Sequence, residues 1–95
     1  MSFYVYILAD RYKGTLYIGM TDDLLRLMFE HQMGIFPRFT KKYGIKMLVW
    51  CEVHDSRESA FRRERQLKKW KRDWKLELIE KFNPGWKDLA ETLNM

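Results

Sequence analysis

The sequence predicts an α/β (α+β) fold in which helices flank a small three-stranded antiparallel sheet. Residues 3–8 and 15–19 alternate two kinds of side chain with the period of two that is typical of strands. A third apolar segment lies at 47–53, and later hydrophobic residues recur at helical spacing. With 95 residues, the chain is expected to form a single domain over 1–95.

The first two strands are predicted to form a hairpin whose turn contains Gly14, because glycine supplies the backbone freedom of a tight reversal. If Leu8 pairs with Thr15, Tyr6 faces Tyr17 and both phenols lie on one face of the sheet. The opposite face is apolar and needs a covering helix. The alternative is that the tyrosines are present only because aromatic residues favour strands.

A helix is predicted after the second strand. Thr21 is a residue type that caps helix N-termini, and the two aspartates after it suit a first helical turn. The helix runs from Leu24 to a stop near Gly34. His31 lies on its apolar side, together with Leu24 and Leu27.

Residues 35–46 form an irregular connection in which Arg38, Lys41 and Lys42 are interleaved with aromatic side chains. Such a pattern can bind a phosphate backbone and stack on bases. It can equally be a loop that its aromatic residues hold against the body of the protein.

The strand at 47–53 is nearly all apolar, which predicts burial on both faces. Asp55 or Ser56 is expected to cap the next helix, over 56–70. Trp74, Leu78 and Phe82 mark an apolar stripe on a further helix. Asn83 and Pro84 stop that helix and start a last short one, whose buried face is predicted to comprise Trp86, Leu89, Ala90 and Leu93.

The net charge of +5 is concentrated in one region. Residues 56–75 hold nine Lys and Arg against three acidic residues, whereas the rest of the chain is near neutral. A basic surface of this kind favours polyanionic partners. Cys51 is the single cysteine, which excludes an internal disulfide and a cysteine-rich zinc site and favours the reducing cytoplasm. No apolar run is long enough to cross a bilayer.

Glu64 occupies an unusual position on the predicted 56–70 helix. At 100° per residue it falls within the arc marked by Ala60, Phe61 and Leu67. A carboxylate on a core-facing side is costly unless charge or hydrogen bonds compensate it. One interpretation is a salt bridge to Lys68, four residues on. The other is a ligand of a hard divalent cation at the rim of a cleft.

These residues, taken in order, resemble the GIY-YIG nuclease domain, most closely its small stand-alone bacterial members. The matching positions are Tyr4-Val5-Tyr6, Leu16-Tyr17-Ile18-Gly19, Thr21, Asp23-Leu24, His31, Arg63-Glu64, Leu67-Lys68-Lys69-Trp70 and Asn83-Pro84. They cover nearly the whole chain. The resemblance implies a metal-dependent DNA endonuclease that acts on structured or damaged DNA.

The resemblance also implies roles for individual residues. Tyr6 would help to activate the attacking water, and Tyr17 would assist or orient it. Glu64 would hold one Mg²⁺ or Mn²⁺, which stabilises the charge of the transition state and the leaving oxygen. His31 would position or shuttle a proton, and Asn83 would complete the cleft.

The sequence departs from the family at Leu27, where the family carries an arginine. Arg26 is adjacent, but one helical step turns its side chain by 100°, away from the face that bears His31. Loss of a guanidinium that clamps the phosphate is expected to cost about 10²–10³ in rate. Arg57 or Lys68, which lie near Glu64 on its helix, are the candidates for compensating charge.

Three functions therefore stay open: an endonuclease, a nuclease-like domain that binds DNA or RNA without cutting it, and a small domain whose tryptophans meet a protein partner. The residues expected to contact nucleic acid are Arg26, Arg38, Lys41, Lys42, Arg57, Arg63, Lys68 and Lys69. We expect a monomer or weak dimer without a membrane partner.

Overall fold

The structure is a computed structural model that describes residues 2–33 and 44–93. Its elements are β1 (Phe3–Ala9), β2 (Leu16–Thr21), α1 (Leu24–Gln32), β3 (Met47–His54), α3 (Arg57–Lys69), α4 (Arg72–Phe82) and α5 (Ala90–Leu93). The strands form one antiparallel sheet in the order β2-β1-β3. The predicted fold class is confirmed.

β1 is the central strand and its register differs from the predicted one. Tyr6 pairs with Gly19 and Leu8 pairs with Tyr17, so the predicted pairing of Leu8 with Thr15 is wrong by two residues. A shift of two leaves every side chain on its predicted face. Tyr6 and Tyr17 are thus diagonal neighbours on one face rather than direct partners.

Asp10 fixes this register by closing the hairpin. Its backbone N–H donates to the Thr15 carbonyl at 3.3 Å, and its carboxylate accepts the Thr15 N–H at 2.7 Å. Gly14 is required beside it, because a Cβ at position 14 would collide with the Asp10 carboxylate. The hairpin therefore closes at the pair of residues 10 and 15.

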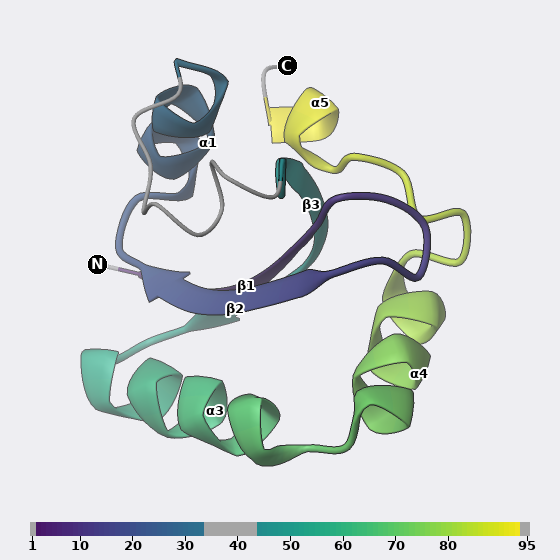
Figure 1. Cartoon of the computed structure of the whole chain (residues 1–95). Helices are drawn as coiled ribbons and strands as arrows, with labels where there is room; N and C mark the ends of the chain where they lie inside the picture. Colours follow the sequence, from purple (N-terminus) through teal and green to yellow (C-terminus); the bar gives the residue numbers. More distant parts are fainter. Residues whose placement is uncertain (1, 34–43, 94–95) are drawn as a thin grey trace.

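Both faces of the sheet are covered, as Figure 1 shows, with α3 and α4 below it and α1 and α5 above. The α3 side holds one core cluster, which includes Val5, Ile7, Ile18, Val49, Ala60, Leu67 and Ile79. The α1 side holds a second cluster, which includes Tyr6, Leu8, Leu24, Met28, Leu48 and Ala90. The predicted covering helix on the apolar face is α3.

The helix starts differ in detail from the predictions. Asp23, rather than Thr21, caps α1, because its carboxylate accepts the Arg26 N–H at 3.0 Å. Ser56 caps α3, and its hydroxyl accepts the Ser59 N–H at 3.1 Å. Of the two caps expected for that helix, the structure thus selects the serine.

β3 follows its prediction in its first half only. Leu48, Val49 and Trp50 are buried, whereas Val53 is 61% exposed. Strand β3 is an edge strand. Glu52 and His54 contact α3, and Val53 lies on the opposite face of the strand. On α3, Ala60 and Leu67 are buried as expected.

Of the apolar stripe predicted for α4, Leu78 packs against the core, whereas the other two residues are exposed. Trp74 and Phe82 are 52% and 53% exposed, and the buried residue of α4 is Ile79. Phe61 on α3 is likewise 47% exposed. Helix α4 lies beside the end of the sheet (Figure 1), so only a narrow side of it reaches the core.

The last helix starts later than predicted. Residues 84–89 are not helical, Trp86 among them has φ 51° and is 3% exposed, and α5 begins only at Ala90. A residue with positive φ cannot belong to an α-helix. In the described part of the chain, no helix is both long and apolar enough to cross a membrane.

Candidate active site

The Tyr6 side chain lies over Gly19 of the neighbouring strand. Tyr6 is 5% exposed, and a Cβ at position 19 would lie 2.6 Å from Tyr6 Cζ and closer still to the phenolic oxygen. Only glycine therefore leaves room for the phenol. The glycine on β2 is thus needed because the tyrosine ring of its partner residue on β1 occupies the space of a Cβ.

Tyr17 completes an aromatic pair with Tyr6. The two ring centroids are 6.5 Å apart and the ring planes are inclined by 31°. Tyr17 is half-buried and belongs to the same side of the sheet as Tyr6. The predicted placement of both phenols on one face is confirmed.

Glu64 lies on α3, which packs against β1 and β2. Its side chain is 13% exposed, and its Oε1 lies 3.1 Å from the Nζ of Lys68. The salt bridge weighed from the sequence is thus present. Lys68 itself is 53% exposed, so solvent weakens this pair and allows the lysine to leave it.

The environment of Tyr6 disfavours its ionisation. Burial raises the pKa of the Tyr6 phenol well above its usual range, and the negative charges of ionised Tyr17 and of Glu64 act in the same direction. Glu64 belongs to α3, which covers the opposite face of the sheet from the cluster of Tyr6, and its charge still acts on the phenol. At neutral pH Tyr6 is a neutral hydrogen-bond donor, and its surroundings oppose its use as a base.

Glu64 is the one metal ligand that the sequence predicts. Within 2–33 and 44–93, no three or more His, Cys, Asp and Glu side chains are grouped so that they could hold a metal ion. A single carboxylate fits only a cation that takes most of its ligands from water and substrate phosphate, as Mg²⁺ does. The donor set is compatible with Mg²⁺ or Mn²⁺ and does not resemble a zinc site.

The first helix places Leu27 and Arg26 on different sides, as the sequence indicates. Leu27 is half-buried against the cluster that contains Tyr6. The Arg26 side chain is 74% exposed, and its Nε lies 3.0 Å from Glu30 Oε1. Arg26 therefore does not occupy the position of the family arginine.

Several predicted site residues lie outside the described residues. His31 belongs to α1, but its side chain is not among those described. Arg38, Lys41 and Lys42 fall in the segment 34–43 and are likewise outside. Their proposed roles stay predictions.

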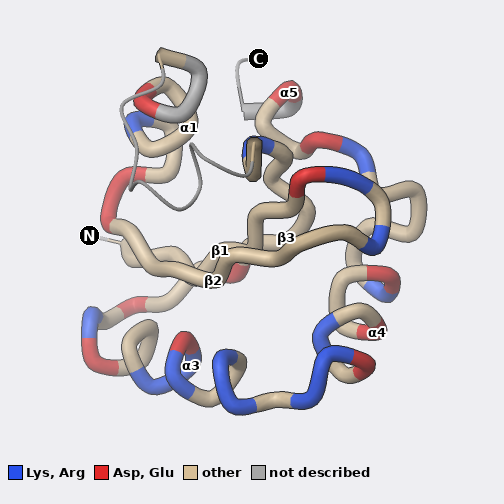
Figure 2. Tube along the Cα trace, viewed as in Figure 1, with Lys and Arg blue, Asp and Glu red and all other residues tan. Residues whose placement is uncertain are grey.

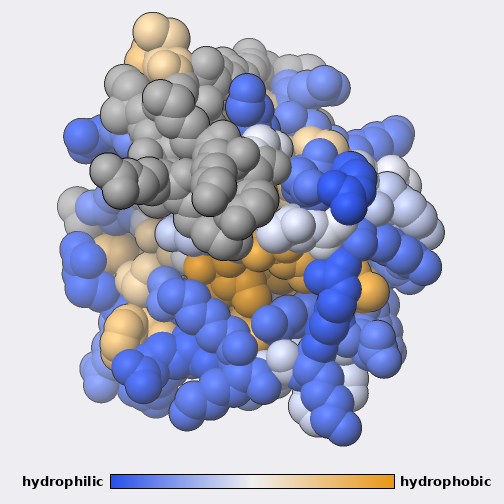
Figure 3. All heavy atoms as spheres, viewed as in Figure 1, coloured by the Kyte–Doolittle hydropathy of each residue, from blue (hydrophilic) through white to orange (hydrophobic). Residues whose placement is uncertain are grey.

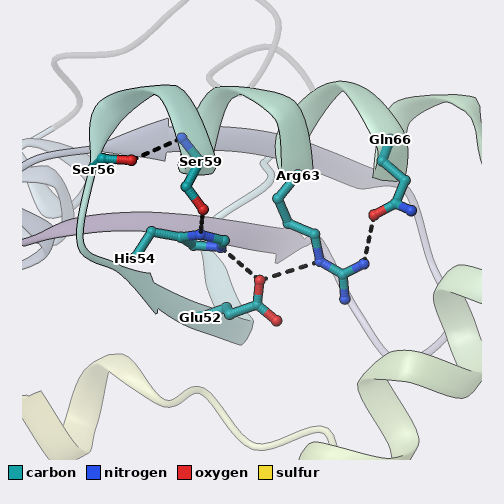
Figure 4. Close-up of polar contacts among 6 residues, drawn as sticks. All are labelled: Glu52, His54, Ser56, Ser59, Arg63 and Gln66. Atoms are coloured by element: carbon teal, nitrogen blue, oxygen red, sulfur yellow. Dashed lines mark hydrogen bonds and ion pairs between the residues drawn. The ribbon is translucent and has the colours of Figure 1, made fainter.

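Arg63 is occupied within the protein (Figure 4). Its Nε donates to Glu52 Oε1 at 3.1 Å, its Nη1 donates to Gln66 at 2.7 Å, and its guanidinium lies over the rings of Trp50 and Trp70. Only 23% of its side chain is exposed. These contacts fasten α3 to β3 and leave little of Arg63 for a ligand.

His54 extends the same network, which sequence reasoning missed. Its Nε2 lies 2.7 Å from Glu52 Oε1, and its Nδ1 lies 2.6 Å from Ser59 Oγ (Figure 4). Glu52 and His54 are two residues apart on a strand and therefore lie on the same face of it. This spacing is the sequence feature from which their contact could have been predicted. The network joins β3 to the first turns of α3.

The other predicted cations of α3 face solvent. Arg57 is exposed, with its guanidinium 5.1 Å from the centre of the Phe3 ring, and Lys69 is exposed near the end of the helix. Figure 2 shows that Lys and Arg gather along α3 and at the start of α4. In Figure 3, hydrophilic residues surround a small apolar area near the middle of this face of the molecule.

Asn83 has a structural role instead of the predicted cleft position. It is 5% exposed, its Nδ2 donates to the carbonyls of Val49 and Lys87 at 3.2 and 2.8 Å, and its Oδ1 accepts the Lys87 N–H at 3.2 Å. These bonds tie the end of α4 to β3. A buried amide engaged in this way is not a surface group of a cleft.

Comparisons with known proteins agree with this architecture. The family described as GIY-YIG catalytic domain matches residues 2–77. A UPF0213 protein of Syntrophus aciditrophicus is 42% identical over 82 residues, which cover 85% of this chain and 92% of that protein. A UPF0213 protein of Staphylococcus saprophyticus is 33% identical over 76 residues, which cover 80% and 92%. The solution NMR structure of a UPF0213 protein from Bacillus halodurans has a TM-score of 0.59, 30% sequence identity and 96% coverage of both chains.

Proposed function

Because this chain belongs to the GIY-YIG catalytic domain family, we propose that it is a metal-dependent nuclease that hydrolyses phosphodiester bonds in DNA. One observation carries the proposal. The phenol of Tyr6 lies over Gly19, the only position of β2 without a side chain, its ring pairs with that of Tyr17, and the charge of Glu64 acts on its ionisation.

The roles proposed for these residues follow from their surroundings. Glu64 would hold a divalent cation, which supplies positive charge to the oxygens of the phosphate. Tyr6 stays neutral through burial, so its phenol donates a hydrogen bond and orients the phosphate or the attacking water. Tyr17 limits where the Tyr6 ring can move. His31 is proposed to move a proton from its place on α1.

Lys68 is proposed to alternate between two partners. Without substrate it neutralises Glu64 at 3.1 Å. Its side chain is 53% exposed and flexible, so it can turn to a phosphate oxygen when the charge of Glu64 is compensated in another way. Together with Arg57 and Lys69, Lys68 would place positive charge along α3 next to the DNA backbone.

A second candidate function is nucleic-acid binding with weak or no cleavage. The observation that favours it is Leu27, a half-buried apolar residue at the family arginine position, while neighbouring Arg26 is paired with Glu30. Without that guanidinium, one electrostatic stabiliser of the transition state is lost. Binding would persist because it depends on the cations Arg57, Lys68 and Lys69 of α3 and not on position 27.

The experiment that separates these functions uses supercoiled, single-stranded and branched DNA with Mg²⁺, Mn²⁺ or EDTA. We expect nicking that requires metal and disappears in Glu64→Gln, which keeps the side-chain shape and removes the charge. The matched control is Glu58→Gln, because Glu58 is 79% exposed and forms the equivalent i,i+4 pair with Arg62. Its activity should equal that of the wild type.

The possible results discriminate clearly. Binding without nicking under every metal condition would refute the nuclease and leave the second candidate. Equal loss of activity in the Glu64 and Glu58 variants would refute the specific role of Glu64. Absence of salt-dependent DNA binding would refute both functions.

A further inference from the structure

A basic hollow of about 410 Å³ lies where the tip of the β1–β2 hairpin meets the first turn of α4. Four cationic residues line it: Arg11 and Lys13 come from the hairpin, and Arg72 and Lys75 come from α4. No carboxylate belongs to the lining. None of these four cations is among the residues that the sequence pattern suggested for nucleic-acid contact.

Arg72 is held in place before any ligand arrives. Its Nη2 donates to the carbonyls of Lys13 and Gly14 at 2.5 and 2.6 Å. An arginine has five N–H donors, and these two bonds use the pair on Nη2. The guanidinium is therefore fixed against the hairpin while the donors of Nη1 and Nε remain, so little conformational entropy is lost when it binds an anion.

The positive charge of the hollow is only partly neutralised. Asp10 pairs with Arg11, and Glu80 lies 3.7 Å from Lys13 in an exposed pair. Within the described part of the chain, Arg72 and Lys75 form no ion pair with an acidic side chain. The hollow thus keeps an excess of two positive charges on two neighbouring helical residues, which favours a ligand with concentrated negative charge.

The hollow is also separate from the Tyr6–Glu64 site. Tyr6 pairs with Gly19, and the last strand pair before the hairpin tip, Ala9 with Leu16, follows three pairs later. Three residues of strand correspond to about 10 Å. Along one strand of duplex DNA, about 10 Å of axis holds about three phosphates. A strand bound in the Tyr6–Glu64 site could therefore extend to the hollow.

We propose that this hollow binds a backbone phosphate of the nucleic acid, as a second contact outside the Tyr6–Glu64 site. The inference rests on the proposed function, since it assumes a nucleic-acid ligand. The contact is electrostatic and does not read bases, so it should act equally on unrelated sequences. Its role is to hold the strand in register with the cleavage site.

The test compares two double variants that each remove two positive charges. Arg11→Gln with Lys75→Gln removes two of the four cations of the hollow and spares Arg72, which anchors the hairpin. Arg62→Gln with Arg65→Gln is the matched control on the outer side of α3, where both residues are exposed. Thermal unfolding first establishes that both variants are folded.

Fluorescence anisotropy then gives the dissociation constant for labelled DNA at several salt concentrations. The hollow variant should bind about tenfold more weakly, the effect of one charge-assisted hydrogen bond. Its slope of log affinity against log salt should be smaller by about 0.9, the value for one lost phosphate contact. The control should change the slope by clearly less. Equal changes in the two variants would overturn the inference, because the effect would then be general charge.

Two further arms separate the remaining explanations. The first arm is an NMR titration with inorganic phosphate, which follows the amide signals of Gly14 and Thr15. If these signals saturate at micromolar phosphate and the hollow variant still binds DNA normally, the hollow binds free phosphate and the proposed contact with the DNA backbone is overturned. Normal binding and nicking by the hollow variant would overturn this inference and leave the proposed function intact. A changed salt slope in a protein that never nicks DNA would support the hollow and contradict the nuclease.

Discussion

Replacing Gly19 by alanine is expected to destabilise the fold and to displace Tyr6. The added Cβ would lie 2.6 Å from Tyr6 Cζ, and the phenolic oxygen would be closer still. These atoms belong to a stiff ring that is 5% exposed, so a small rotation of a flexible side-chain end cannot relieve the collision. The ring or the strand must move.

The sign of the effect follows from two opposed contributions to the free energy of unfolding. Overpacking a buried site costs about 1–3 kcal/mol. Replacing glycine with alanine at a tolerant position stabilises a protein by about 0.4–1 kcal/mol, because the unfolded chain loses freedom. The cost of the collision therefore outweighs the gain, and each 1 kcal/mol of net loss should lower the Tm of a domain of this size by about 4–8 °C.

Thermal and urea denaturation measure the change, and the nicking assay reports the displaced phenol. Gly85→Ala is the matched control, because its Cβ would meet only the Lys87 side chain at 3.6 Å. In a Tyr6→Leu background, Gly19→Ala should lose most of its cost, since no ring lies over position 19. A Gly19→Ala protein that is as stable and as active as the wild type would refute this explanation.

Three other perturbations have defined outcomes. Asn83→Ala should cost about 1–3 kcal/mol in urea denaturation, because two backbone carbonyls lose their donor, while activity per folded molecule persists; equal stability would contradict the structural role. In absorbance titrations against pH, Tyr6→Phe should remove the tyrosine transition that occurs at the highest pH. Because its pKa is raised in the folded protein, Tyr6 contributes stability that is fully present below pH 10.0 and is lost as the pH rises further. Leu27→Arg should raise nicking by up to about 10²-fold, whereas Leu25→Arg, at a 55% exposed position, should not.

The hairpin shows what alternation can and cannot predict. A period of two assigns Tyr6 and Tyr17 to one face correctly, but it is equally compatible with any register shifted by two. The register depends on the bonds between Asp10 and Thr15, and a sequence pattern does not display side chain to backbone bonds. The face was therefore predictable and the pairing was not.

The later helices show a second limit. Periodicity finds the stripe of Trp74 and Phe82, but it cannot tell how much of a helix at the end of a sheet reaches the core. For Asn83, the partners are the backbone carbonyls of distant Val49 and nearby Lys87, and bonds to backbone groups have no signature in the sequence. Glu64 was found because a carboxylate among apolar neighbours is visible on a helical wheel.

The order β2-β1-β3 has a consequence for how the chain reaches this structure. β1 pairs with β2 across a short turn, but the other edge of β1 pairs with β3, which comes much later in the sequence. In that pairing Phe3 is the partner of His54. Closing such a long loop is entropically costly and slow compared with forming a hairpin. During synthesis, the emerging hairpin therefore exposes a row of unpaired amide and carbonyl groups to neighbouring chains until residue 54 has left the ribosome.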